Sequence, residues 1–176
     1  MNNLKLLETV ADISYIAGCK KYYSGNSRVD ISEYIIWAKE FEKKSTNREG
    51  VAESKSLNTE LLFIDLIKSE KDFSPSTLYQ DYALSDTLFH WQSQNATRSD
   101  VGKGLSYIQH EDSGKKILLF VRERNENEYK NTMSYVFIGE GNYVEHYGSK
   151  PMSISWELNE PLPSYLWKES AKMAVG

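Results

Sequence analysis

The sequence has few of the residues that anchor a disulfide framework, a thiolate metal cluster or a membrane span. It contains one cysteine, Cys19, in 176 residues, which excludes an internal disulfide and a zinc site built from several thiolates. No apolar run approaches the roughly 20 residues that a membrane-spanning helix needs. The first residues, with Glu8 and Asp12, lack the basic-then-apolar order of a signal peptide. We therefore expect an intracellular protein with no membrane partner, stabilised by burial of apolar side chains.

The chain also lacks an excess of basic residues. Residues 1–57 contain 9 Lys and Arg against 8 Asp and Glu, and residues 58–176 contain 12 against 17. A protein that binds nucleic acid mainly through phosphates needs such an excess, because the release of counterions supplies the affinity. If this chain binds DNA, we expect a few local groups to recognise it.

Motifs of several enzyme classes are missing as well. His90, His110 and His146 are 20 and 36 residues apart and lie in no HExxH or HxE context, so no metal site is predicted. The sequence has no GxSxG elbow and no GxxxxGK[ST] or GxGxxG phosphate loop. The triplets Glu53-Ser54-Lys55 and Glu128-Tyr129-Lys130 match the E-x-K half of a metal-dependent nuclease site. Both lie in polar, loop-like stretches, so a small nuclease is a minor alternative and no cofactor is predicted.

The spacing of apolar residues divides the chain near residue 57. Up to Lys55, apolar positions recur at helical spacing and predict a helical hairpin, and the polar stretch Ser45–Ser56 is expected to be a linker or an exposed loop. Beyond Asn58, short apolar runs between turn residues predict strands at Leu61–Ile67, Leu105–His110, Lys116–Arg122, Ser134–Gly139 and Ser153–Leu158. A helix is expected over Leu162–Met173. The predicted fold is α+β: an N-terminal helical extension (1–57), then a curled or barrel-like antiparallel sheet with a C-terminal helix (58–176).

Aromatic residues are abundant, with 4 Trp, 12 Tyr and 6 Phe, and the segment Phe73–Gln94 mixes them densely with polar groups. A pocket for a planar polar ligand has this composition, because rings enclose the ligand and fixed polar groups bind its edge. The alternative is that the rings are core residues, with Trp91 packed beneath a sheet and Gln92 and Gln94 solvated.

Four segments together resemble a known family: KSEKDFSPSTLYQDYALSDTLFHWQSQ, ILLFVRE, Tyr135–Gly139 and HYGSKPMSISWELNEPLP. The chain resembles, over Leu61–Pro163, an uncharacterised domain at the C-terminal end of bacterial proteins that combine a phospholipase-D-type nuclease with a superfamily II helicase. In type IV restriction enzymes of the SauUSI kind, this end is the target-recognition domain. The resemblance implies a fold similar to the SRA domains of the PUA-like barrel group.

The function implied by this resemblance is noncatalytic recognition of 5-methylcytosine or 5-hydroxymethylcytosine in double-stranded DNA by base flipping. The chain would be part of an ATP-dependent restriction endonuclease in the bacterial cytoplasm, acting in antiviral defence. Its partners would be modified DNA and the helicase and nuclease domains of the parent protein. A scaffold that docks the helicase to the nuclease without contacting DNA remains open as an alternative.

Two groups of residues are candidates for this recognition. Capture of a flipped base requires stacking rings and hydrogen bonds to the Watson–Crick edge. The base-pocket candidates are Asp81 for the N4 amino group, Tyr79 and Tyr82 or Trp91 for stacking, and Ser93 and Gln94 for edge contacts. Asp81 could equally cap a turn. The candidates for DNA backbone or groove contacts are Arg98, Lys103, Arg122, Arg124 and Lys150, each of which could equally be a solvated surface residue. Arg98 and Lys103 flank a polar stretch that we expect to be a groove-probing loop.

Overall fold

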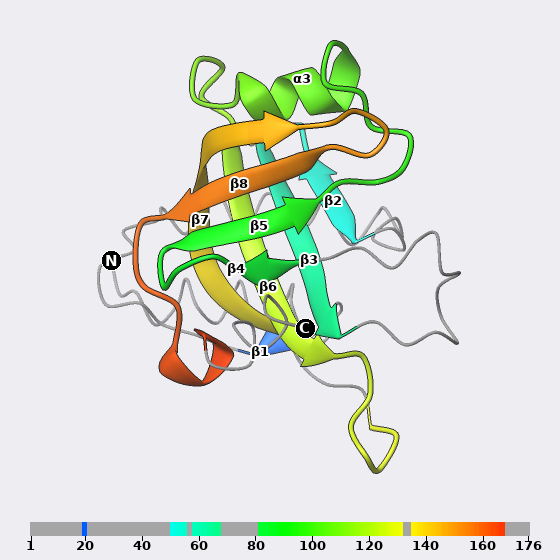
Figure 1. The fold of residues 1–176 in the computed structure, drawn as a ribbon, viewed down its shortest axis with the longest axis vertical. Coiled ribbons are helices and arrows are strands. Elements are labelled where there is room, and N and C mark those ends of the chain that lie inside the picture. Colours follow the sequence, from blue (N-terminus) through cyan, green and yellow to red (C-terminus); the bar gives the residue numbers. More distant parts are fainter. Residues whose placement is uncertain (1–18, 21–49, 56–57, 68–80, 132–134, 168–176) are drawn as a thin grey trace.

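The computed structural model describes residues 19–20, 50–55, 58–67, 81–131 and 135–167 (Figure 1). These ranges contain the helix α3 (Gly102–Ile108) and a helical turn at residues 164–167. Their strands are β1 (Cys19–Lys20), β2 (Val51–Ser54), β3 (Thr59–Ile67), β4 (Tyr82–Ala83), β5 (Leu88–Gln92), β6 (Lys116–Arg124), β7 (Tyr135–Tyr147) and β8 (Ser153–Leu158). Within the described part of the chain, no helix is long and apolar enough to cross a membrane. The expected helical hairpin lies outside these residues.

The strands form one curled, open sheet in the order β2-β3-β6-β7-β8-β5-β4, with β1 paired to β7. The pairs β3–β6 and β1–β7 are parallel, and the other pairs are antiparallel. The expectation of an antiparallel sheet was therefore wrong, because the sheet is mixed. β3 and β6 are buried along nearly their whole length, as strands of parallel pairs commonly are.

The long strand β7 connects the two halves of the sheet. Its first part pairs with β6 and its last part, from Gly141, pairs with β8. Gly139 has φ +118°, a conformation that L side chains rarely adopt, and lies beside a register shift in the pairing of β7 with β6. A Cβ at Gly141 would lie 2.7 Å from Leu119 Cδ1, so β7 passes close to the core. The strands β8, β5 and β4 consequently cross in front of β6 and β3 (Figure 1).

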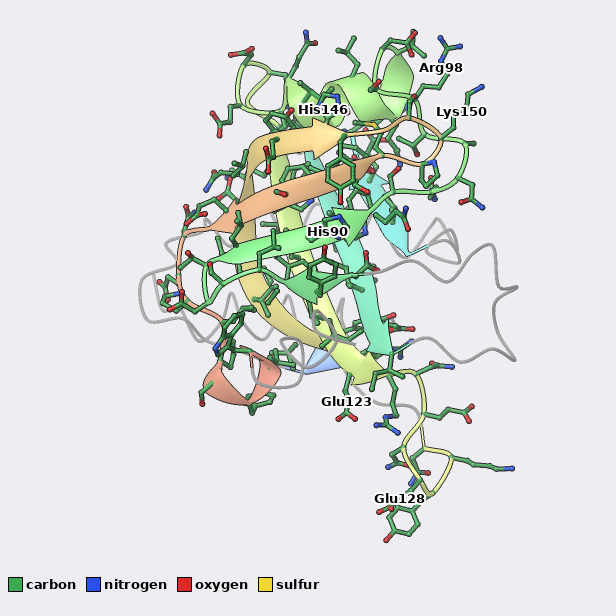
Figure 2. All side chains as sticks on the ribbon, in the orientation of Figure 1. His90, Arg98, Glu123, Glu128, His146 and Lys150 are labelled. Atoms are coloured by element: carbon green, nitrogen blue, oxygen red, sulfur yellow. The ribbon has the colours of Figure 1, made fainter. Side chains whose placement is uncertain are left out.

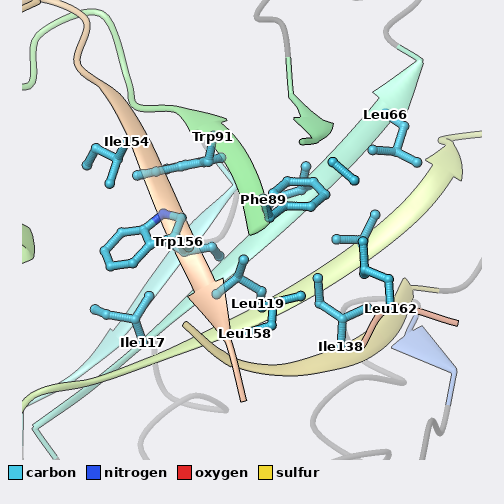
Figure 3. Packing of buried hydrophobic residues seen from close by; sticks show 14 of the residues in the cluster. Leu66, Phe89, Trp91, Ile117, Leu119, Ile138, Ile154, Trp156, Leu158 and Leu162 are labelled. Atoms are coloured by element: carbon cyan, nitrogen blue, oxygen red, sulfur yellow. The ribbon is translucent and has the colours of Figure 1, made fainter. Parts of the chain in front are cut away.

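The hydrophobic core lies between these two halves (Figure 3). Trp156 on β8 is fully buried and meets the edge of the Tyr107 ring from α3, with ring centroids 6.1 Å apart. Burial of each such large side chain contributes about 1.5–3 kcal/mol to folding. On the reverse face of β3, β6 and β7, a second aromatic cluster contains Phe63, Phe120, Phe137 and Tyr135.

The predicted strands at β3, β6 and β8 are confirmed, but two other expectations were wrong. The segment Leu105–His110 lies largely within the helix α3, which buries Gly104 and Tyr107 one turn apart. The stretch Ser45–Ser56 is not wholly a linker, because β2 within it pairs with β3. The division at residue 57 stays a prediction, since residues 21–49 lie outside the described part.

Candidate functional site

The strand β5 sends alternate side chains to opposite faces of the sheet. Phe89 and Trp91 belong to the core, whereas His90 and Gln92 point to the outer face. The Trp91 ring meets the edge of the Tyr107 ring, with centroids 5.4 Å apart at an interplanar angle of 90°. The placement of Trp91 therefore favours the packing interpretation over a stacking role.

A cluster of rings from β4, β5 and β7 lies around His90, which Figure 2 labels. We call Tyr82, His90 and Tyr147 the outer-face cluster. Tyr82 stacks on His90, with centroids 4.6 Å apart and ring planes 14° from parallel. The Tyr147 hydroxyl lies 3.0 Å from His90 Nε2. His90 is only 5% exposed, whereas Tyr147 is 58% exposed. The cluster thus combines a buried imidazole with an aromatic ring that a ligand can reach.

The environment of the cluster keeps the Tyr82 hydroxyl protonated. Burial, together with the nearby Tyr147, raises the pKa of Tyr82 above its ordinary value. The neutral Tyr82 hydroxyl can therefore both donate and accept hydrogen bonds at physiological pH.

Three predicted base-pocket residues hold the backbone around β5. Asp81 is buried, and its Oδ1 accepts a hydrogen bond from the backbone N–H of Gln92 at 2.7 Å. Ser93 is also buried, and its Oγ accepts from the N–H of Met152 at 2.9 Å. The carbonyl of Gln94 accepts from the N–H of Thr97, and Ser93 Oγ donates to the same carbonyl. The geometry gives Asp81 the backbone-capping role that the sequence left open. Tyr79 lies outside the described residues.

Two loops at the end of β5 and β7 are bound to each other, and we call residues 93–101 and 148–152 the paired loops. The N–H of Lys150 donates to the carbonyl of Thr97 at 2.9 Å, and the N–H of Ser99 donates to Ser149 Oγ at 3.3 Å. Arg98 and Lys150 are both exposed on these loops (Figure 2). Two predicted DNA-contacting residues are thus brought together from positions far apart in the sequence.

The other predicted DNA contacts form ion pairs within the chain. Arg122 is buried, pairs with Asp65 and lies 4.1 Å from the centre of the Tyr135 ring. Its placement favours a packing role in the sheet. Arg124 pairs with the adjacent Glu123. Lys103 lies in the first turn of α3, not in a loop as expected, and its Nζ is 2.8 Å from Glu60 Oε1.

Glu60 is the centre of a buried ion cluster. It is 0% exposed, and its Oε1 also accepts from the Tyr107 hydroxyl at 2.8 Å. Lys115 Nζ lies 2.9 Å from Glu60 Oε2, and this ion pair lacks the alignment of a hydrogen bond. The same Nζ lies 3.0 Å from Glu53 Oε1. Burial alone would lower the pKa of Lys115, but the two carboxylates outweigh it and raise the pKa. Burial likewise would raise the pKa of Glu53, but Lys115 lowers it.

This cluster bears on the nuclease alternative. The Glu53 carboxylate of the first E-x-K triplet faces the ammonium group of Lys115. The second triplet lies on the exposed β6–β7 connection, where Figure 2 shows Glu128. Across the residues that the structure describes, no three His, Cys, Asp or Glu side chains are grouped so that they could hold a metal ion.

Sequence reasoning missed His90 and Tyr147 as candidates. Strand alternation within Leu88–Gln92 was a usable signal for His90, because it separates His90 from the core residues Phe89 and Trp91. Tyr147 is 57 residues from His90 and reaches it across β8. No local pattern predicts that contact.

A family comparison covers most of the chain. The family described as a domain of unknown function (DUF3427) matches residues 20–170. No curated protein matches the chain. The match includes both the outer-face cluster and the paired loops.

Proposed function

The chain belongs to the DUF3427 family, and from its sequence motifs and its outer-face cluster we propose that it is a noncatalytic module that binds double-stranded DNA and recognises 5-methylcytosine or 5-hydroxymethylcytosine. In this proposal the curled sheet is of the SRA kind within the PUA-like group. The module serves the helicase and nuclease domains of a restriction enzyme in the bacterial cytoplasm.

The observation that carries the proposal is the outer-face cluster. The core already contains Phe89, Trp91 and Trp156, so the rings of Tyr82 and Tyr147 are not needed to fill it. An exposed tyrosine ring beside a hydrogen-bonded imidazole offers a stacking surface and polar groups for a base edge. Tyr147 replaces Trp91 in our proposed stacking set, while Asp81 and Ser93 position the strand and its exit loop.

The energetics of this recognition are modest. Flipping a base out of the duplex costs a few kcal/mol. Stacking returns roughly 1–3 kcal/mol per base, so Tyr82 and Tyr147 together can offset the flip. The added methyl contributes about 1–3 kcal/mol in a shaped pocket, which limits discrimination to about 10-fold to 200-fold. The parent enzyme must therefore add selectivity of its own.

The test is a binding titration with three labelled duplexes that differ only in one central cytosine, which is unmodified, methylated or hydroxymethylated. We expect tighter binding of a modified duplex. Tyr147→Ala should weaken that binding about 5-fold to 150-fold, the loss of one stacking contact. Tyr129→Ala is the matched control, because Tyr129 is also an exposed tyrosine, at 75% against 58% for Tyr147, but lies on the β6–β7 connection.

Three outcomes would contradict the proposal. Equal affinity for all three duplexes would show that the chain does not recognise the modified base. Equal effects of Tyr147→Ala and Tyr129→Ala would show that the outer-face cluster does not contact the DNA. A chain that binds no duplex even at low salt would favour the scaffold alternative.

A further inference from the structure

Asp100 pairs with Arg98, one of the two exposed cations of the paired loops. Its carboxylate accepts two hydrogen bonds from the Arg98 guanidinium, at 2.9 Å from Nε and 2.5 Å from Nη2. The pKa of Asp100 is lowered by these hydrogen bonds and by the charges of Arg98 and Lys150. Both side chains of the pair remain accessible, Arg98 being 47% and Asp100 59% exposed. Asp100 therefore occupies the Nε–Nη2 edge of Arg98 while solvent can still reach both side chains.

The surroundings make these two cations important for any contact with phosphate. Lys103, Lys115 and Arg122 are held by acidic side chains inside the fold. The backbone hydrogen bonds between the paired loops keep Arg98 and Lys150 on one small surface. With Asp100 this surface has a net charge of +1, from two cations and one anion.

We propose that Asp100 weakens the sequence-independent part of DNA binding by competing with phosphate for Arg98. This inference rests on the proposed function. A guanidinium binds one carboxylate or one phosphate with its two parallel donors. A phosphate that binds the same Nε–Nη2 edge of Arg98 must therefore displace the Asp100 carboxylate, which stays nearby and repels it.

The competition favours selectivity for the modified base. Recognition of one methyl group is limited, and unmodified sites outnumber modified ones in a genome. A strong phosphate contact would be made on both kinds of site and would hold the protein on unmodified DNA. Asp100 weakens this phosphate contact on both kinds of site, so the protein dissociates from unmodified DNA sooner.

The experiment compares Asp100→Asn with the wild-type chain on an unmodified and a methylated duplex over a series of salt concentrations. Freeing Arg98 for one more phosphate should steepen the slope of log affinity against log salt by up to about 0.9. Affinity for the unmodified duplex should rise roughly threefold at low salt. Thermal melting shows whether the variant stays folded.

Two matched variants identify the cause. Glu128→Gln makes the same change in net charge at the opposite end of the molecule (Figure 2) and should leave the slope unchanged. The double variant Arg98→Gln, Asp100→Asn should lose the gain in affinity. A Glu128→Gln gain equal to that of Asp100→Asn, or a double variant that keeps the gain, would overturn the inference.

The two proposals fail in different ways. A wild-type chain that binds both duplexes equally refutes the proposed function. A clear preference for the methylated duplex, with the same salt slope for Asp100→Asn and wild type, refutes only the role of Asp100.

Discussion

Replacing Gly104 with alanine should destabilise the protein, although glycine to alanine in an exposed helix interior usually stabilises by about 1 kcal/mol. An added Cβ would lie 1.9 Å from the carbonyl oxygen of Arg98 and 2.5 Å from Met152 Sδ. Ordinary contact begins near 3.4 Å, so α3 and the loop must separate by more than an ångström. The closest atom belongs to the backbone, so rotation of a side chain cannot relieve the contact.

The cost follows from this geometry. Overpacking of a dense site costs about 1–3 kcal/mol, and we expect the upper end because a helix must move. In a chain of 176 residues, about 3 kcal/mol lowers the melting temperature by roughly 6–12 °C. Urea denaturation should show a lower midpoint with an unchanged slope, since the surface exposed on unfolding is the same.

Gly102→Ala is the matched control. Gly102 has φ +58° and no atom within 4 Å of an added Cβ, so its replacement costs only backbone strain of about 1–2 kcal/mol. Gly104→Ala should therefore be the more damaging of the two. If it is equally stable or more stable than Gly102→Ala, the close packing of α3 against Arg98 is wrong.

Three further predictions concern buried polar groups. Glu60→Gln removes one of the two carboxylates that pair with Lys115, and because Glu53 remains we expect a loss of at most about 3–5 kcal/mol in urea denaturation; a loss below about 1 kcal/mol would contradict a buried ion cluster. The free energy of unfolding should fall as pH rises above about 10, and Tyr107→Phe should reduce this slope. The carboxylates of Glu60 and Glu53 raise the pKa of Lys115 above its unfolded value of 10.5, and burial and Glu60 raise the pKa of Tyr107 above its unfolded value of 10.0. Their contribution is therefore complete below those values and lost as pH rises through the folded ones. Ser93→Ala should cost about 1–3 kcal/mol, because the N–H of Met152 loses its acceptor. Unchanged stability with lost DNA affinity would instead place Ser93 in the base pocket.

Strands with long apolar runs between turn residues were predictable. Leu61–Ile67 and Lys116–Arg122 are nearly continuous apolar runs, and both became long buried strands. The same continuity is typical of parallel strands buried on both faces, and it was a usable signal that the sheet is mixed. The pairing partners themselves depend on contacts between distant segments, which no local pattern specifies.

The failure at Leu105–His110 has a physical cause. A window of six residues fits a strand period and a helix period equally well. In the structure the helix buries Gly104 and Tyr107, and the buried position at Gly104 has no side chain to reveal it. The decisive feature, close approach of backbone to backbone, leaves no hydrophobic pattern in the sequence.

The sequence predicted a segment that contributes to the candidate site better than it predicted the individual residues of that site. The segment FHWQSQ does contain His90 of the outer-face cluster, but sequence reasoning selected Trp91, which packs inside. Large rings fill cores more often than they bind ligands, and strand alternation separates the two neighbours. Tyr147 joins the cluster only through the pairing of β7 with β8 and of β8 with β5.

The course of β7 limits how this protein can be divided. The strand begins beside β1, which comes from residues 19–20, and ends at Tyr147 on the outer face. Both layers share this one continuous ribbon, so no cut along the chain leaves a binding half and a supporting half that are each complete. A shortened fragment that keeps only β8, β5 and β4 would retain Tyr82 and His90 but lose the strand that carries Tyr147.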